Sequence, residues 1–219
     1  MSLSNSPKLI QGGLVILAAG GGSAKQTIAL QYNPDTLRRS YQVQGSGGDA
    51  GAERATPFRL KWPAIETIKL DAEIDATDGL EHPDQNPHAV AFGVAPQLAA
   101  LEGLVNPSVS ELQALDSRAA SGTLEIVPPE APLVLFVWGR GRVVPVRVQE
   151  FSITEEAFDA ALNPVRAKVS LGLRVLSTDD LGFQAKGGAL FLNHLRSREA
   201  LAAKAGNAAT GALGLSSLP

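Results

Sequence analysis

One alternating segment constrains the fold of this chain more than any other feature. Between Asn163 and Val175 (NPVRAKVSLGLRV) every second residue is apolar, and the residues between them are basic or small. This period of two is typical of a β-strand that packs one face on a core and leaves the other in water. The wet face carries Arg166, Lys168 and Arg174, although the net charge is −3. The segment predicts a half-exposed sheet.

Further alternating or apolar runs predict the other strands. They cover residues 9–17, 26–32, 37–43, 68–74, 133–138 and 144–153, with a short run at 58–62. Residues 133–138 (LVLFVW) are all apolar, which predicts a strand buried on both faces. Gly139-Arg140-Gly141 then predicts a tight hairpin turn. The apolar phase slips by one residue before Phe151, which predicts a β-bulge near Gln149-Glu150.

Helical patterns occupy the middle and the end of the chain. Residues 95–105 and 108–120 have helical spacing, with Ser108 or Ser110 as the expected N-cap, and 178–204 is helical again. Residues 75–88 and 44–56 are polar or Gly-rich and are expected to be loops. We therefore expect a mainly β fold with a helical insert (α+β). Its β domain is 1–177 with the insert at about 76–120, followed by a helical segment at 178–205 and a flexible tail at 206–219.

Composition and charge exclude several classes of function. The chain has no Cys, so it has neither disulfides nor thiolate chemistry. Its slight negative charge gives no footprint for nucleic acid. Residues 14–19 are apolar but too short to cross a bilayer, and the N-terminus lacks a secretory signal pattern. We expect synthesis in the cytoplasm and no direct insertion into a membrane.

Candidate catalytic and metal sites are weak. His82, Asp84 and His88 lie in a Pro-rich segment without a fixed ligand spacing, and Gly20–Lys25 lacks the Ser or Thr of a phosphate loop. The carboxylates at 155, 156 and 159 have nothing nearby to raise a pKa, and His194 is expected on the surface of a helix. We expect no enzyme activity, no cofactor and no bound metal.

Basic residues on the strands are the more informative feature. They either solubilise a wet face or form a surface that meets an acidic partner or copies of the chain. The sequence leaves both interpretations open. The residues are Arg38, Arg59, Lys61, Arg140, Arg142, Arg147, Arg166, Lys168 and Arg174.

Four motifs, in order, resemble a known family. They are YNPDTL at 32–37, PQLAALE at 96–102 followed by Asn106-Pro107, PLVLFVWG at 132–139, and NPVRA at 163–167. In this order they resemble the tube-like baseplate hub or adaptor (tube-initiator) proteins of contractile injection systems, which are related to contractile phage tails. Two features differ from that family. Its members often end in a LysM module, which is absent here, and usually have Gly where this chain has Asn163, a residue that also visits left-handed turns.

The resemblance implies a phage tail-tube-like antiparallel β-barrel or sandwich that joins a hexameric ring. The implied partners are other copies of the chain, a spike or hub protein, the inner tube protein and the baseplate wedge. Such a ring would belong to a phage-tail-like particle that is either released or anchored at the envelope. Residues expected at the lumen, between rings or between subunits are Asn33, Pro34, Arg38, Arg39, Arg142, Arg147, Asn163, Arg166, Lys168 and Arg174.

The alternative is a stand-alone β-sandwich that binds a glycan or an effector protein. An exposed aromatic cluster would favour it. Trp62 and Trp138, however, fall on strands with the pattern of a core. The structural ring protein is therefore the leading hypothesis.

Overall fold

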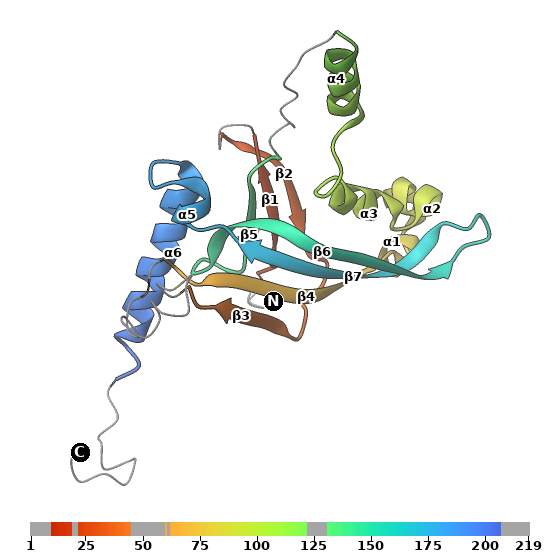
Figure 1. Ribbon diagram of the computed structural model, residues 1–219. Coiled ribbons are helices and arrows are strands. Elements are labelled where there is room, and N and C mark those ends of the chain that lie inside the picture. Colours follow the sequence, from red (N-terminus) through yellow and green to blue (C-terminus); the bar gives the residue numbers. More distant parts are fainter. Residues whose placement is uncertain (1–9, 19–21, 45–59, 61, 122–130, 207–219) are drawn as a thin grey trace, which may run out of the picture.

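Seven antiparallel strands form one sheet in the computed structural model, which describes residues 10–18, 22–44, 60, 62–121 and 131–206. The strand order is β2-β1-β5-β6-β7-β4-β3 (Figure 1). This confirms the predicted mainly β fold. The strands are β1 (Gly13–Leu17), β2 (Ala24–Ala29), β3 (Leu37–Gln42), β4 (Ile65–Asp75), β5 (Val134–Val137), β6 (Val143–Phe158) and β7 (Pro164–Val175).

The alternating segment lies at the centre of the sheet. β7 pairs with β4 along one side and with β6 along the other. Its apolar row is buried as predicted, from Ala167 to Val175, and packs with Phe136 and Ile68 in one core. The predicted bulge is confirmed as a register shift between Val148 and Glu150. β5 is buried on both faces, also as predicted.

The sheet is open, so the expectation of a barrel or sandwich is wrong for the single described chain. β2 and β3 stand at the two ends of the strand order and do not pair with each other. Instead β1 and β2 run at a steep angle to β4 and β7 (Figure 1). The side chain of Gln31, which follows β2, connects this corner to the end of β4. The amide of Gln31 donates to Asp75 O at 2.8 Å and accepts from Asp75 N at 2.9 Å. Alternation predicts a buried face, but not whether the end strands meet.

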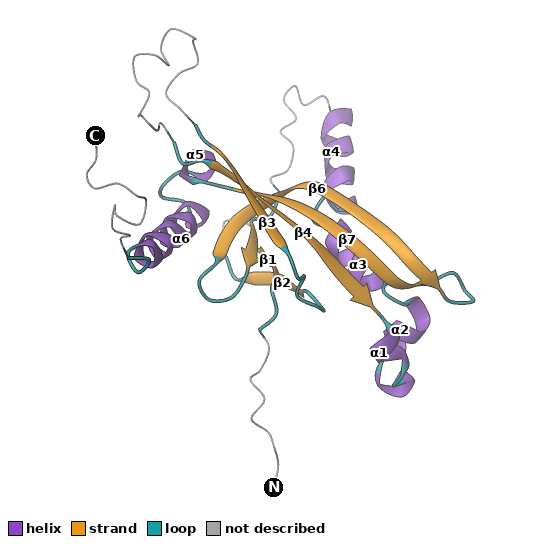
Figure 2. Cartoon of the chain, turned by 90° about the horizontal axis from the view of Figure 1, so that it is seen from below, coloured by secondary structure: helices purple, strands orange, loops and turns teal. Residues whose placement is uncertain are grey.

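Helices of the insert follow β4 and occupy one end of the sheet (Figure 2). The predicted helices are confirmed as α3 and α4, and Ser108 forms a capping box with Glu111. The loop expected at 75–88 is instead largely helical. Pro83 and Pro87 begin η2 and α2, because proline is favoured in the first turn of a helix. The elements are α1 (Thr77–Leu80), η2 (Pro83–Gln85), α2 (Pro87–Phe92), α3 (Ala95–Glu102) and α4 (Val109–Ala120).

The C-terminal helices lie at the opposite end. The expected single helix is broken into α5 (Thr178–Leu181) and α6 (Lys186–Ala202) by Gly182, whose φ of 75° cannot continue a helix. His194 was expected on the surface but is only 6 % exposed. It follows the buried Phe191 by three residues and so shares its helix face. The loop at 45–56, most of the run at 58–62 and the tail from 207 lie outside the described residues.

Candidate assembly surface

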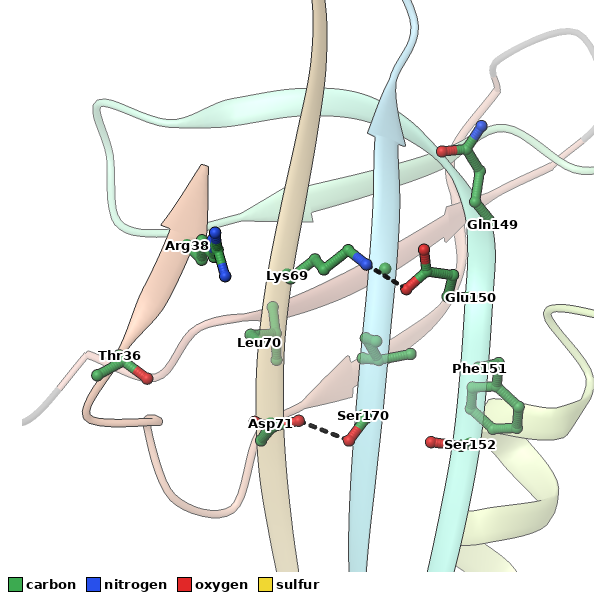
Figure 3. Close-up of a pocket in the computed structure, with 12 residues that line it drawn as sticks. Thr36, Arg38, Lys69, Leu70, Asp71, Gln149, Glu150, Phe151, Ser152 and Ser170 are labelled. Atoms are coloured by element: carbon green, nitrogen blue, oxygen red, sulfur yellow. Dashed lines mark hydrogen bonds and ion pairs between the residues drawn. The ribbon is translucent and has the colours of Figure 1, made fainter. Parts of the chain in front are cut away.

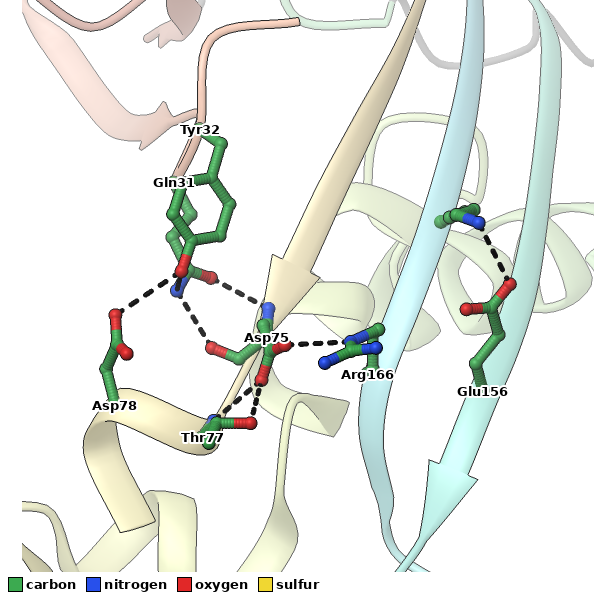
Figure 4. Close-up of polar contacts among 8 residues, drawn as sticks. Gln31, Tyr32, Asp75, Thr77, Asp78, Glu156 and Arg166 are labelled. Carbon is green, nitrogen blue, oxygen red and sulfur yellow. Dashed lines mark hydrogen bonds and ion pairs between the residues drawn. The ribbon is translucent and has the colours of Figure 1, made fainter. Parts of the chain in front are cut away.

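The basic residues on the wet face of β7 are paired with carboxylates of the same chain. β7 lies between β4 and β6, which place acidic residues beside it, and α5 supplies one more. The row that looked positive in the sequence is therefore charge-balanced. Figure 4 shows the first pair. The N···O distances are 2.8 Å for Arg166–Asp75, 3.3 Å for Lys168–Glu156 and 2.7 Å for Arg174–Asp180.

Asp75 is the centre of a polar corner at the end of β4 (Figure 4). Its carboxylate accepts a hydrogen bond from the backbone N–H of Thr77 at 2.8 Å, another from the Thr77 hydroxyl, and the Arg166 ion pair. The Thr77 hydrogen bonds, and then Arg166, lower the pKa of Asp75. Because Gln31 binds the backbone of the same residue, this corner ties the segment after β2 to β4 and β7.

A shallow groove of about 670 Å³ crosses the same polar face (Figure 3). The Lys69 ammonium and the Glu150 carboxylate form an ion pair across β7, directly over Gly172. A Cβ at Gly172 would lie 2.8 Å from the Cβ of Glu150, so glycine makes room for this pair. Ser170 donates to Asp71 beside it. Of the charged side chains that line the groove, Lys69 pairs with Glu150 and Asp71 accepts from Ser170, while Arg38 forms no ion pair among the described residues.

The two Asn-Pro corners have structural roles within the chain. Asn33 accepts from Gly12 N at 2.8 Å and donates to Ile10 O at 2.9 Å, so it holds the start of β1. Pro34 follows it, half-buried. Asn163 donates to Asp159 at 2.8 Å, and these hydrogen bonds lower the pKa of Asp159.

Asn163 also donates to Ala91 O at 3.2 Å, which links the β6–β7 hairpin to α2. The left-handed residue of this turn is Leu162, with φ of 65°, and not Asn163. The idea that Asn163 replaces a glycine through a left-handed conformation is therefore wrong. The residue acts through its side-chain hydrogen bonds.

The remaining expected site residues fall into two groups. Arg38 and Arg147 are exposed and, among the described residues, form no ion pair. Arg147 stands directly across from Arg174. Arg39 and Arg142 belong to a different place and line a hollow beside α6.

A group of exposed apolar side chains lies at the end of the sheet where β6 and β7 join. Phe158 is 51 % exposed and pairs with Pro164 across the hairpin, Leu162 is 79 % exposed, and Phe92 of α2 is 51 % exposed. The junction is fixed by a 2.8 Å hydrogen bond from Val94 N to Pro164 O. We call Phe92, Phe158 and Leu162 the tip surface. This surface was not predicted, because only the carboxylates at 155, 156 and 159 stood out in this segment of the sequence.

Neither a metal-binding cluster nor a membrane-spanning helix occurs within the described part of the chain. No cluster of three or more His, Asp or Glu side chains there could hold a metal ion. None of its helices is both long enough and apolar enough to cross a membrane. No protein-family model matches the chain, and no curated protein matches its sequence. Function is therefore inferred from the arrangement of the side chains.

Proposed function

We propose that the chain is a structural, non-enzymatic subunit that joins copies of itself in a hexameric ring, as a baseplate adaptor of a contractile injection system. The observation that carries this proposal is the tip surface. Large apolar side chains exposed together at one end of a sheet are typical of a contact with another protein. Leu162 strengthens the case, because a branched residue with positive φ carries backbone strain that burial in an interface would offset.

The ends of the sheet supply a second contact of the same kind. Both β2 and β3 lack a strand partner on their outer side among the described residues, and most of β2 is exposed. Unpaired edge strands invite pairing with another chain. In a closed ring each copy would cover the edges of its neighbour, which removes the exposed edges.

The two ends of the subunit carry different structural elements, which would give a ring a direction. The insert and the tip surface occupy one end, and α5 and α6 occupy the other (Figure 2). A ring of such subunits has two different faces, so one would fit the spike or hub protein and the other the inner tube. The charge-balanced face of β4, β7 and β6 would line the lumen or meet the next ring, and the baseplate wedge would contact the outside. The ring would form after cytoplasmic synthesis, within a phage-tail-like particle that is either released or anchored at the envelope.

The oligomeric state of the purified full-length chain tests the proposal. We expect a ring visible by negative-stain electron microscopy and a hexamer by light scattering. Phe158→Glu and Leu162→Glu each place a charge in the contact and should weaken assembly by about 2 kcal/mol or more per interface. Phe183→Glu is the matched control, because Phe183 is 61 % exposed but lies at the α5–α6 end.

Two results would contradict the proposal. One is a monomer at every concentration, which would favour the stand-alone binding module. The other is equal loss of assembly in Phe183→Glu and in the two tip variants, which would show that the tip surface is not a specific contact.

A further inference from the structure

A buried carboxylate lies beneath α6 and is fully engaged by two arginines. Glu66, the second residue of β4, is 4 % exposed. Arg39 of β3 approaches its Oε1 at 2.6 Å, and Arg198 of α6 approaches its Oε2 at 3.6 Å. The ring of Tyr41 lies 5.2 Å from each of these two guanidinium groups. Each oxygen of the Glu66 carboxylate therefore already has an arginine partner.

A third arginine leaves this cluster with excess positive charge. Arg142, just before β6, makes no ion pair with a carboxylate of the described residues. Three guanidinium groups therefore face one carboxylate, an excess of two positive charges. Burial and the charge of Arg39 lower the pKa of Arg142, although Glu66 opposes them. This direction is expected where positive charges are incompletely neutralised.

His194 adds a buried donor that has no partner. Its side chain is 6 % exposed, and neither ring nitrogen has a hydrogen-bond partner among the described residues. Buried polar groups without partners are rare in folded proteins. His194 is one of the residues that line a hollow of about 400 Å³, and its two ring nitrogens are themselves buried. The hollow is lined by Arg39, Trp138, Gly141, Arg142, His194, Arg198 and Leu201.

We propose that this hollow binds a small divalent oxyanion of the sulfate or phosphate type. Guanidinium groups bind such anions through paired N–H donors, here from Arg142 and Arg198, and the imidazole of His194 supplies another N–H. Two negative charges offset the excess of two positive charges. The site lies within one chain, so it is independent of the proposed ring.

Calorimetric titration of the full-length chain with sodium sulfate, at constant ionic strength set with chloride, tests the proposal. We expect saturable binding that Arg142→Gln weakens about tenfold or more, because a hydrogen bond to a charged group is lost. Arg147→Gln is the matched control, since Arg147 is exposed on β6 outside the hollow. Absence of saturable binding, or equal weakening in both variants, would overturn the site.

The pH dependence of sulfate binding provides a second, independent test. Burial lowers the pKa of His194, Glu66 raises it, and the charges of Arg198, Arg39 and Arg142 lower it further. A bound anion favours the imidazolium, so sulfate should bind more tightly as the pH falls from about 8 to about 6, while sulfate itself stays divalent. Sulfate binding that does not change with pH would show that His194 is not part of the site.

Nuclear magnetic resonance of the imidazole groups keeps the test valid even if a variant fails to fold. The chain has three histidines. Sulfate should shift the ring nitrogen signals of His194 in the wild-type chain and leave those of the exposed His82 and His88 unchanged. Equal shifts in all of them, or none, would contradict specific binding.

Discussion

Gly93 joins the helical insert to the sheet, and its replacement by alanine should destabilise the chain strongly. The residue has φ of 56° and ψ of −130°, a conformation that side chains rarely adopt. A Cβ there would lie 2.0 Å from Pro164 O, which is the acceptor of the hydrogen bond from Val94 N. A backbone carbonyl cannot turn aside as a flexible side chain does, so the junction must shift.

The magnitude follows from three contributions. The disfavoured backbone costs about 1–3 kcal/mol, and loss or distortion of the Val94 hydrogen bond costs about 1 kcal/mol. Alanine restricts the unfolded chain relative to glycine, which returns roughly 0.5 kcal/mol. We therefore expect Gly93→Ala to lower the free energy of unfolding by about 3 kcal/mol from these contributions, a shift of roughly 1 M or more in the urea midpoint.

Urea unfolding followed by circular dichroism measures this loss. Gly103→Ala is the control within the same insert. Gly103 has an ordinary helical φ of −61°, and the nearest atom to its added Cβ is 3.5 Å away. It should be neutral or about 0.5 kcal/mol stabilising. A loss below about 1 kcal/mol at Gly93, or equal losses at both glycines, would refute the reasoning.

Three further predictions concern charge and strain. Glu66→Gln removes the buried carboxylate that pairs with the half-buried Arg39 and the exposed Arg198 and should cost about 2 kcal/mol in urea unfolding, whereas the exposed-face variant Glu156→Gln should change little. The lowered pKa of Asp75 contributes stability above the ordinary carboxyl pKa that is lost as the pH falls through the folded value. Asp75→Asn should therefore flatten the acid limb of the stability curve, and an unchanged limb would contradict this. Leu162→Gly removes a left-handed leucine and should leave unfolding stability equal or up to about 1 kcal/mol higher, while light scattering shows weaker assembly.

Local patterns in the sequence were sufficient to predict β7 and the bulge at 149–150, and they limited the N-cap of α4 to Ser108 or Ser110. Each depends on residues close together in the chain, through side-chain alternation or a short-range hydrogen bond. Whether the end strands of the sheet meet depends instead on residues that are far apart in the sequence. Gln31 and Asp75 are linked by side-chain and backbone hydrogen bonds that no periodicity signals.

The candidate site likewise combines residues that the sequence made visible with contacts that it did not predict. The positive residues of β7 were visible in the sequence, but the partners that balance them lie on β4, β6 and α5. Glu66 and His194 were missed because each looks ordinary in its own segment. The helical spacing of Phe191, His194 and Arg198 was the signal that could have placed His194 on the inner face of α6.

The tip surface was hidden for a different reason. The apolar alternation predicted a strand only over residues 144–153, yet β6 continues to Phe158 because it pairs with β7. Strand length here is set by the partner strand rather than by local composition.

The most direct test of the central claim is to isolate the tagged chain from its native cells. The captured material would be imaged by negative-stain electron microscopy and its proteins identified by mass spectrometry. The ring proposal predicts needle-like sheathed particles that contain sheath, tube and spike proteins, with this chain at a low, fixed copy number relative to the tube protein. A lone chain recovered without those partners would contradict it.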